Sequence, residues 1–321
     1  MRIFVYEYLT ANGIGREPGS PEHGMYLEGR AMRDAVVADF ERISFAEPFA
    51  FPDKATPVEQ KWVEEVARFS DWTLVIAPEF GGTLFNLAHS VQSVNGQLLG
   101  PSLDAIQLTS NKLALAEHWR THSIRTPATT DCEPTPCELF PVVWKPRDGA
   151  GSTNTFLIRD AFELAQAIAG DPRQPMILQE FVPGRAASVA FLCGPRTQLP
   201  LLPTFQLLSD GQFQYRGGEL PIPSELAARA VELASRAVKC VSGLLGYVGV
   251  DLVLGDAKDG SRDYAIEINP RLTTSYIGLR TLAACNLAEV MLKVARGEDV
   301  DALKWKNGQV RFTPEGSIQS F

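Results

Sequence analysis

The sequence predicts a protein of mixed α/β and α+β class, with a parallel α/β part at the N-terminus and an antiparallel sheet near the C-terminus. Strand-like and helix-like segments alternate over the first 80 residues, which is typical of a parallel sheet. Further on, two apolar segments, 246–254 and 264–271, flank a turn rich in Gly and Asp and predict a β-hairpin. The 321 residues, 45% hydrophobic and 21% charged, suffice for two or three domains.

The N-terminal alternation begins with a predicted strand at 2–8 and a loop at 10–21. Helices at 24–43 and 58–69 and a strand at 73–77 follow, from the spacing of apolar residues. The loop contains Gly13 and Gly15, but the next position of a G-x-G-x-x-G fingerprint is Pro18, so a dinucleotide site is disfavoured. In open α/β sheets, ligands bind at the carboxyl ends of strands, and we therefore expect this loop to face a substrate.

Two acids, Glu28 and Glu79, are placed near this edge of the predicted sheet. Glu79 follows the strand at 73–77, and Glu28 lies early in the helix that the loop precedes. We expect both to meet a substrate. An exposed salt bridge is the alternative that the sequence leaves open for each.

The middle of the chain predicts a phosphate-binding segment. A helix, capped by Thr109 or Ser110, is expected to run to about Arg120 and to begin beside Lys112. A strand in the segment that starts at Phe140 ends in Lys145 and leads into the loop Gly149-Ala150-Gly151-Ser152. One fixed cation beside several free backbone N–H groups can hold phosphates, although a bare Gly-Ala-Gly turn is commonly only structural. The chain has no Walker motif.

A helix at 161–169 and strands at 176–182 and 187–192 come next. The first of these strands carries Gln179, Glu180, Phe181 and Val182. Backbone groups beside an apolar slot can recognise an adenine ring with little side-chain chemistry. This strand therefore predicts the adenine end of a nucleotide site.

The hairpin predicts a cation site. If its arms pair about Asp259, Asp251 lies opposite Glu267, and side-chain alternation then places Asp251, Glu267 and Asn269 on one face. Such oxygen ligands suit Mg²⁺, which completes its shell with water and phosphates. Pro270 ends the strand and turns Arg271 towards whatever the metal holds. The alternatives are a solvated acidic face or an acid paired with a lysine.

Composition limits the other function classes. A net charge of −8 argues against a general nucleic-acid binder, and no apolar stretch of about 18 residues predicts a membrane span. Five scattered cysteines do not form a disulfide framework, which favours a cytoplasmic protein. His118 and His122 have the i,i+4 spacing of a zinc helix without the glutamate of H-E-x-x-H, so we expect surface histidines, and we expect Cys132 and Cys137 to be loop residues.

Five sequence blocks in one order carry a family resemblance. They are Asn111-Lys112, Trp144-Lys145-Pro146 with its Gly-Ala-Gly-Ser loop, Gln179 to Gly184, Gly249-Val250-Asp251 and Glu267 to Arg271. Over roughly residues 109–280 their order and spacing resemble the ATP-grasp superfamily. The resemblance implies an N-terminal α/β domain, a central lid and a C-terminal catalytic domain, which we place at 1–108, 109–193 and 194–321.

The resemblance also implies roles for the site residues. ATP would be held by a set comprising Lys112, Lys145, Gly149, Gly151, Ser152, Gln179, Glu180, Phe181 and Val182. Two Mg²⁺ ions, or Mn²⁺ in their place, would be held by Asp251, Glu267 and Asn269. Arg271 and Lys145 would act on the transferring phosphoryl group. A homodimer is compatible with the family.

More narrowly, Arg2 to Tyr8, Glu28 to Met32 and Glu267 to Tyr276 look similar to tyramine–glutamate ligases of methanofuran synthesis and their relatives in one-carbon metabolism. This implies that a small carboxylate and an amine, such as glutamate and tyramine, are joined by an amide bond through an acyl phosphate. Substrate contacts would involve Glu28, Glu79 and Arg280.

Two departures from the family pattern favour another class of protein. Residues 185–188 lack the acid that usually holds the ribose, and Gly249 replaces an arginine found two residues before the first metal aspartate in relatives of D-alanine ligase. Arg271 or Arg280 could substitute for that arginine. The alternative is a degenerate nucleotide-binding protein without ligase turnover.

Overall fold

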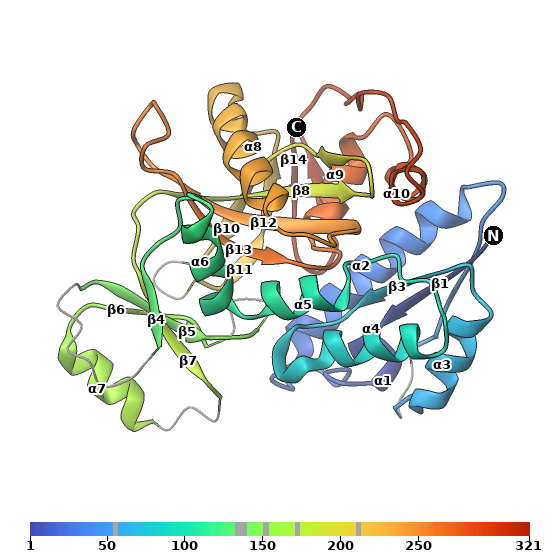
Figure 1. Ribbon diagram of the computed structural model, residues 1–321, viewed down its shortest axis with the longest axis horizontal. Coiled ribbons are helices and arrows are strands. Elements are labelled where there is room, and N and C mark those ends of the chain that lie inside the picture. Colours follow the sequence, from blue (N-terminus) through green and yellow to red (C-terminus); the bar gives the residue numbers. More distant parts are fainter. Residues whose placement is uncertain (54–56, 132–139, 150–153, 171–173, 210–212) are drawn as a thin grey trace.

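The computed structural model describes residues 1–53, 57–131, 140–149, 154–170, 174–209 and 213–321. Its strands form three sheets of three, eight and four strands. Figure 1 shows the N-terminal sheet and the largest sheet side by side, with the smallest sheet next to helices α5 (Leu103–Ser110) and α6 (Lys112–Thr121). The predicted fold class is therefore confirmed. Within the described residues, no helix is both long and apolar enough to span a membrane.

The N-terminal sheet is parallel, in the order β2-β1-β3. Its elements are β1 (Arg2–Glu7), α1 (Tyr8–Asn12), α2 (His23–Glu41), β2 (Glu47–Ala50), α3 (Gln60–Arg68), β3 (Trp72–Ile76), the 3₁₀ turn η1 (Phe80–Gly82) and α4 (Thr83–Ser93). The expectation of a loop from residue 10 was wrong. Glu7 accepts hydrogen bonds from the N–H groups of Leu9 (3.1 Å) and Thr10 (2.7 Å), and so begins helix α1 there.

The predicted cap of the helix that carries Lys112 also needs correction. Thr109 and Ser110 end helix α5, and Asn111 caps α6 by accepting a hydrogen bond from the N–H of Ala114 at 3.1 Å. Asn at an N-cap satisfies donors that the helix itself leaves free. As a result, Lys112 is the first residue of α6 and is buried rather than solvated.

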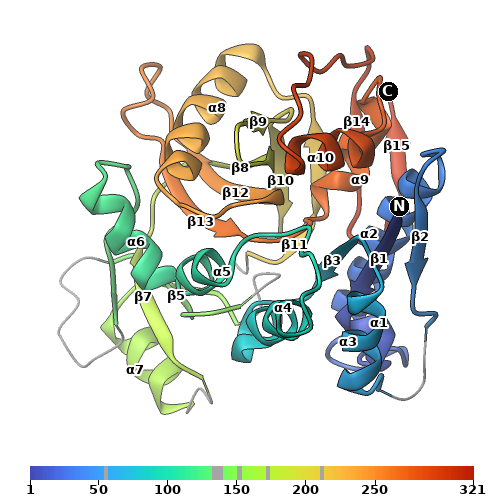
Figure 2. The same cartoon turned by 45° about the vertical axis from the view of Figure 1, so that its right-hand side comes forward.

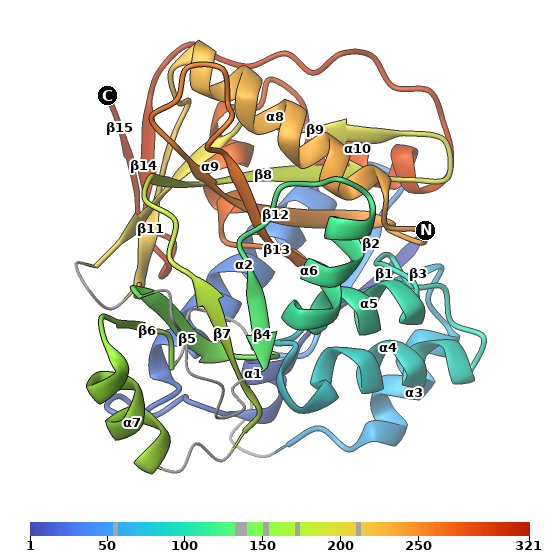
Figure 3. The same ribbon diagram turned by 60° about the vertical axis from the view of Figure 1, so that its left-hand side comes forward.

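The smallest sheet is antiparallel, in the order β4-β7-β5-β6, with helix α7 (Ala161–Ala169) beside it. Its strands are β4 (Thr129–Asp131), β5 (Val142–Pro146), β6 (Phe156–Ile158) and β7 (Met176–Glu180). It has a small hydrophobic core of its own, centred on Trp144, Ile158 and Leu178. Figure 3 shows this unit beneath the largest sheet.

The largest sheet is antiparallel and contains the predicted hairpin. Its strands are β8 (Arg185–Cys193), β9 (Gln198–Pro200), β10 (Thr204–Leu208), β11 (Tyr215–Leu220), β12 (Gly246–Leu254), β13 (Tyr264–Asn269), β14 (Val310–Phe312) and β15 (Ile318–Ser320). Strand β8 pairs with β12 here, although the predicted division places residues 185–193 in the central segment. The domain boundaries themselves stay a prediction.

Alternation along β8 sorts its side chains to two covered faces. Val189 and Phe191 pack with helix α8 (Ser224–Lys239), whereas Ala190 and Leu192 join the core that includes α9 (Ser275–Leu282) and α10 (Leu287–Ala295). Figure 2 shows α8 and α10 on opposite sides of the sheet. A strand buried on both faces is expected to be almost entirely apolar, as β8 is.

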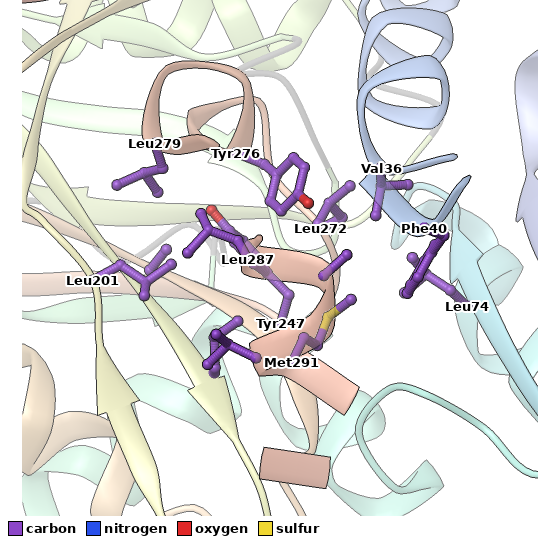
Figure 4. Packing of buried hydrophobic residues seen from close by; sticks show 14 of the residues in the cluster. Val36, Phe40, Leu74, Leu201, Tyr247, Leu272, Tyr276, Leu279, Leu287 and Met291 are labelled. Carbon is purple, nitrogen blue, oxygen red and sulfur yellow. The ribbon is translucent and has the colours of Figure 1, made fainter. Parts of the chain in front are cut away.

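The N-terminal sheet and the largest sheet share one hydrophobic core. Val36 and Phe40 of α2 lie opposite Leu272 and Met291 from the C-terminal part of the chain (Figure 4). The four-stranded sheet, in contrast, has a separate core. The site described below therefore has one wall fixed by a shared core and another wall on a smaller, independently packed unit.

Candidate active site

The oxygen-ligand cluster lies on the hairpin β12–β13. Asp251 pairs with Glu267 and Gly249 with Asn269, so the predicted register is confirmed, with a shift directly after Asp251. Asn269 Nδ2 donates to Asp251 Oδ2 at 3.2 Å. A further group that sequence reasoning missed, Gln206 of β10, donates from Nε2 to Asp251 Oδ1 at 2.9 Å. The three predicted ligands thus face one side of the sheet together.

Two lysines from other elements meet this cluster. Lys112 Nζ lies 3.5 Å from Glu267 Oε2 and donates to the carbonyl oxygen of Gly149 at 3.1 Å. Lys145, near the end of β5, is only 6% exposed and Lys112 is 9% exposed. The sequence left open that an acid of the hairpin pairs with a lysine, and Glu267 does pair with Lys112. This pairing does not account for Asp251, which lies beside Glu267, accepts from two side-chain amides and forms no salt bridge with a lysine or arginine among the described residues.

The charges of this cluster act on one another strongly because the groups are buried. Burial lowers the pKa of Lys145 to about 8, with Lys112 adding to the effect and Glu267 opposing it. Burial, reinforced by the nearby charge of Glu267, raises the pKa of Asp251. For Glu267, burial favours the neutral acid, but Lys112 and Lys145 outweigh it and lower the pKa. Asp251 is thus an acid whose charge the protein alone does not compensate.

A cavity of about 260 Å³ opens onto the cluster. Its wall combines residues of the four-stranded sheet with residues of the largest sheet and Glu28 of α2. Among the predicted site residues, those that line it are Glu28, Lys112, Lys145, Gly149, Gln179, Glu180, Phe181, Val182, Asp251, Glu267, Asn269 and Arg271. Gly151 and Ser152, and also Cys132 and Cys137, lie outside the described residues.

The end of the cavity near β7 is suited to a flat ring. Phe181 and Phe213 lie on its wall with their ring centroids 6.4 Å apart. In the part of the chain that the structure describes, the main-chain N–H of Phe181 donates to Pro141 at 3.3 Å, whereas that of Val182 has no partner. Gln179 is buried and donates to the hydroxyl of Thr129 at 2.9 Å, so its side chain is already engaged.

Two further charged groups, Glu28 of α2 and Arg271 after β13, also line the cavity. Arg271 Nε donates to Glu79 Oε1 at 2.9 Å, and the two side chains are only 10% and 4% exposed. Glu28 accepts a hydrogen bond from the hydroxyl of Thr274, and burial raises the pKa of its carboxyl group. A smaller cavity of about 40 Å³ adjoins here, and Glu28 and Arg271 line both. Glu79 does form a salt bridge, as the alternative from the sequence expected, but the pair with Arg271 is buried and not exposed.

Arg280 lies away from both of these cavities. Its guanidinium donates to Asp39 through Nε at 2.8 Å and through Nη2 at 2.6 Å, and Tyr276 donates to the same carboxylate at 2.6 Å. Asp39 is 2% exposed. The structure therefore does not bring Arg280 to the other predicted site residues. It links helix α2 to helix α9.

Replacing Asp39 with alanine is expected to lower the free energy of unfolding by about 3 kcal/mol, because Arg280 and Tyr276 then lose their buried partner. Urea denaturation would measure it. Glu41→Ala, an exposed change at the end of the same helix, is the matched control and should stay within about 0.5 kcal/mol of the parent. A loss below about 1 kcal/mol for Asp39→Ala would show that this network contributes little.

The two departures from the expected motif have structural consequences. A Cβ on Gly249 would lie 2.8 Å from Cγ2 of Thr273, so a longer side chain needs that neighbour to move. In the segment 185–188, Arg185 stacks on Phe205 while Ser188 faces the cavity. Of the two arginines that could substitute at position 249, Arg271 lines the cavity and Arg280 does not.

Comparison with family models and with known relatives agrees with this geometry. A model described as the ATP-grasp domain matches residues 109–275, and one described as the pre ATP-grasp 3 domain matches residues 31–106. A tyramine–L-glutamate ligase of Methanocaldococcus jannaschii is 29% identical over 97% of this chain and 94% of that protein. The enzyme of the same name from Methanocaldococcus fervens is 32% identical over 93% of this chain and 95% of that protein.

Solved structures show the same fold. An ATP-grasp superfamily protein from Archaeoglobus fulgidus superposes with a TM-score of 0.72 at 28% identity, covering 97% of this chain and 92% of the other. An L-amino acid ligase from Bacillus licheniformis has a TM-score of 0.69 at 16% identity, covering 97% and 78%, which speaks for the fold alone. The chain belongs to the ATP-grasp family of ATP-dependent ligases.

Proposed function

We propose that this protein joins a small carboxylate to an amine at the expense of ATP, through an acyl phosphate. The observation that carries the proposal is the cluster of Asp251, Glu267 and Asn269 facing Lys112 and Lys145 in one cavity. The similarity to tyramine–L-glutamate ligases over nearly the whole chain supports an amide product, with glutamate and tyramine as candidate substrates. A place in one-carbon metabolism is part of the proposal.

The donor set fits divalent magnesium. Carboxylate and amide oxygens are the ligands that Mg²⁺ takes in proteins, and the uncompensated Asp251 needs a positive partner. We propose that Asp251, Glu267 and Asn269 hold two such ions, or Mn²⁺ in their place. When bound, the metal would neutralise charge on the phosphate oxygens.

The chain's own residues would then bind and orient the nucleotide. We assign the phosphates to Lys112 and Lys145 with the backbone near Gly149, and the adenine to the free N–H of Val182 between apolar walls. The segment 185–188 lacks the acid that usually holds the ribose. Within it, Ser188 faces the cavity and Arg185 does not. The ribose is thus held by a hydroxyl rather than a carboxylate in this proposal.

The reaction needs positioning more than covalent chemistry by the protein. A substrate carboxylate oxygen bonds to the γ-phosphorus as the bond to ADP breaks. The amine nitrogen then bonds to the acyl carbon as phosphate leaves, and the amine gives up a proton. Arg271, fixed by Glu79, is placed to hold the transferring phosphoryl group, and Lys145 to neutralise its oxygens.

Glu28 is proposed to face the amine. Its carboxylate stands where the larger cavity meets the smaller one, and an amine arrives mostly as a cation at neutral pH. Glu79 would act on the substrate side through Arg271. Arg280 is instead proposed to hold α2 against α9.

Glu28→Gln is expected to raise the KM for the amine by about 10- to 100-fold, because a charged hydrogen bond is lost. The KM for ATP should stay within about twofold, since the glutamine oxygen can still accept from Thr274 and the phosphate end is untouched. Steady-state ADP release would measure both constants. Glu17→Gln, at an exposed position, is the control. Equal changes in both constants would refute a specific role for Glu28 towards the amine.

The proposed function is tested by ADP release in a matrix of carboxylates and amines that includes glutamate and tyramine. We expect release that requires one member of each class and an amide product by mass spectrometry. Release with a carboxylate alone would indicate a phosphotransferase that stops at the acyl phosphate. If the protein binds the nucleotide but releases no ADP with any pair, the alternative of a binding protein without turnover is favoured. The departures at 185–188 and Gly249 are the observations that favour this alternative.

A further inference from the structure

The fold brings two histidines and a cysteine together at the end of α6 opposite to Lys112. His118 lies in the last turn of α6, and His122 and Cys240 are the residues directly after α6 and α8. One ring nitrogen of each histidine and the cysteine sulfur all lie within 4.8 Å of one another. His122 is exposed, as expected from sequence, but His118 and Cys240 are half-buried. The proposed ligase chemistry does not use this cluster.

The packing of α6 on α8 holds the three residues in place without any ligand. Trp119, between the histidines, is fully buried and donates from Nε1 to the carbonyl oxygen of Ala237 at 3.2 Å. Cys240 Sγ lies 3.2 Å from the same oxygen. The two helix ends are therefore joined through buried Trp119, which holds His118 and Cys240 near each other.

Each imidazole ring is held by a hydrogen bond to a main-chain carbonyl oxygen. His118 Nε2 lies 2.9 Å from the carbonyl oxygen of Cys240, and His122 Nδ1 lies 2.8 Å from that of His118. Because a carbonyl only accepts, each ring donates there, and each neutral ring keeps a lone pair on its other nitrogen. Donation of the second ring N–H to a carbonyl is the usual support for a histidine ligand.

The two rings also lie close to each other, with their centroids 4.3 Å apart. Imidazole nitrogens together with a cysteine sulfur form a donor set preferred by Zn²⁺ and its neighbours in the first transition row. Donor atoms around a tetrahedral Zn²⁺ are roughly 3.3–3.6 Å apart, so only small shifts of the three side chains would close the site.

We propose that His118, His122 and Cys240 bind one transition-metal ion of the Zn²⁺ class and thereby clamp α6 to α8. The exposed side of His122 leaves a fourth position for water. The Cys240 thiol would lose its proton on binding, because the thiolate is the form that ligates a metal. The clamp acts on the helix whose first residue, Lys112, reaches Glu267, but it touches none of the nucleotide-binding groups.

Cobalt titration of the purified full-length protein tests the site, because a thiolate bound to Co²⁺ gives a charge-transfer absorption that oxygen ligands do not. We expect this band to saturate at one equivalent, together with the strong visible bands of tetrahedral Co²⁺. Cys240→Ser should abolish the charge-transfer band, and His122→Gln, an exposed change, should weaken binding by about 100-fold. Cys285→Ser, at an exposed cysteine, and Asp251→Asn, in the ATP cavity, should leave the band unchanged.

Zinc binding should also raise the melting temperature of the parent protein by about 3–6 °C at 100 times its Kd, and should not do so for Cys240→Ser. A titration without a charge-transfer band would overturn the proposal. So would a band that survives in both Cys240→Ser and His122→Gln. Because the readouts are absorption and melting, they are independent of whether the protein ligates any substrate pair.

Discussion

Replacing Glu267 with glutamine is expected to lower the rate of ligation by about 10²- to 10³-fold, the range seen when one preorganised electrostatic group is removed. Glu267 faces Asp251 across the hairpin and lies 3.5 Å from Lys112. Glutamine keeps the size of the side chain but removes the negative charge on which a divalent ion depends. Lys112 and Lys145 would then face each other without the acid that offsets them. Single-turnover ADP formation with saturating substrates measures the effect.

The matched control for this change is Glu289→Gln, which removes a half-exposed carboxylate from a surface pair with Lys293. That variant should ligate at the parental rate, because exposed pairs contribute about 1 kcal/mol or less and touch nothing in the cavity. Circular dichroism and a melting curve should show both variants folded. Ligation by Glu267→Gln within tenfold of the parent would refute the assignment of the metal site to this cluster.

Replacing Lys145 with methionine is expected to lower kcat/KM for ATP by about 10²- to 10³-fold while leaving the fold as stable as before, or more so. The side chain is 6% exposed, and burial lowers its pKa to about 8. Burial therefore makes the charged form of Lys145 less favourable in the folded protein. A bound anion would stabilise that charge. Methionine has a similar length but no charge. We therefore expect the substitution to lower the activity without lowering the stability of the fold.

Two measurements on this variant separate a functional lysine from a structural one. ATP turnover should fall, and the melting temperature should stay level or rise; Lys293→Met, at a side chain 41% exposed, should change neither by much. A Lys145→Met protein that melts lower and still turns over ATP within tenfold of the parent would show that the ammonium stabilises the fold and does not contact phosphates.

The parts of the site that the sequence predicts well are those set by local periodicity. The pairing of Asp251 with Glu267 follows from a Gly- and Asp-rich turn between two apolar arms. Once the centre of that turn is placed, the register is given, and the register decides which side chains lie on the same face of the sheet. The helix at 161–169 was predicted to the residue. Lys145 at the end of its strand was found by the same local pattern.

The parts that the sequence does not predict depend on contacts between distant segments. Arg271 and Glu79 are 192 positions apart, and nothing local indicates that Glu79 would fix the arginine rather than meet substrate directly. Gln206 on Asp251 and Cys240 beside His118 are of the same kind. Short elements were also missed: β2 has four residues, and α1 begins only because Glu7 caps it. Tertiary packing decides such elements more than intrinsic propensity does.

The most direct test of the central claim is a crystal structure with a non-hydrolysable ATP analogue and Mn²⁺, recorded with anomalous diffraction from manganese. We expect anomalous peaks bound by Asp251, Glu267 and Asn269, with the phosphates against Lys112 and Lys145 and the adenine beside Val182. Manganese elsewhere, or a nucleotide outside this cavity, would contradict the account.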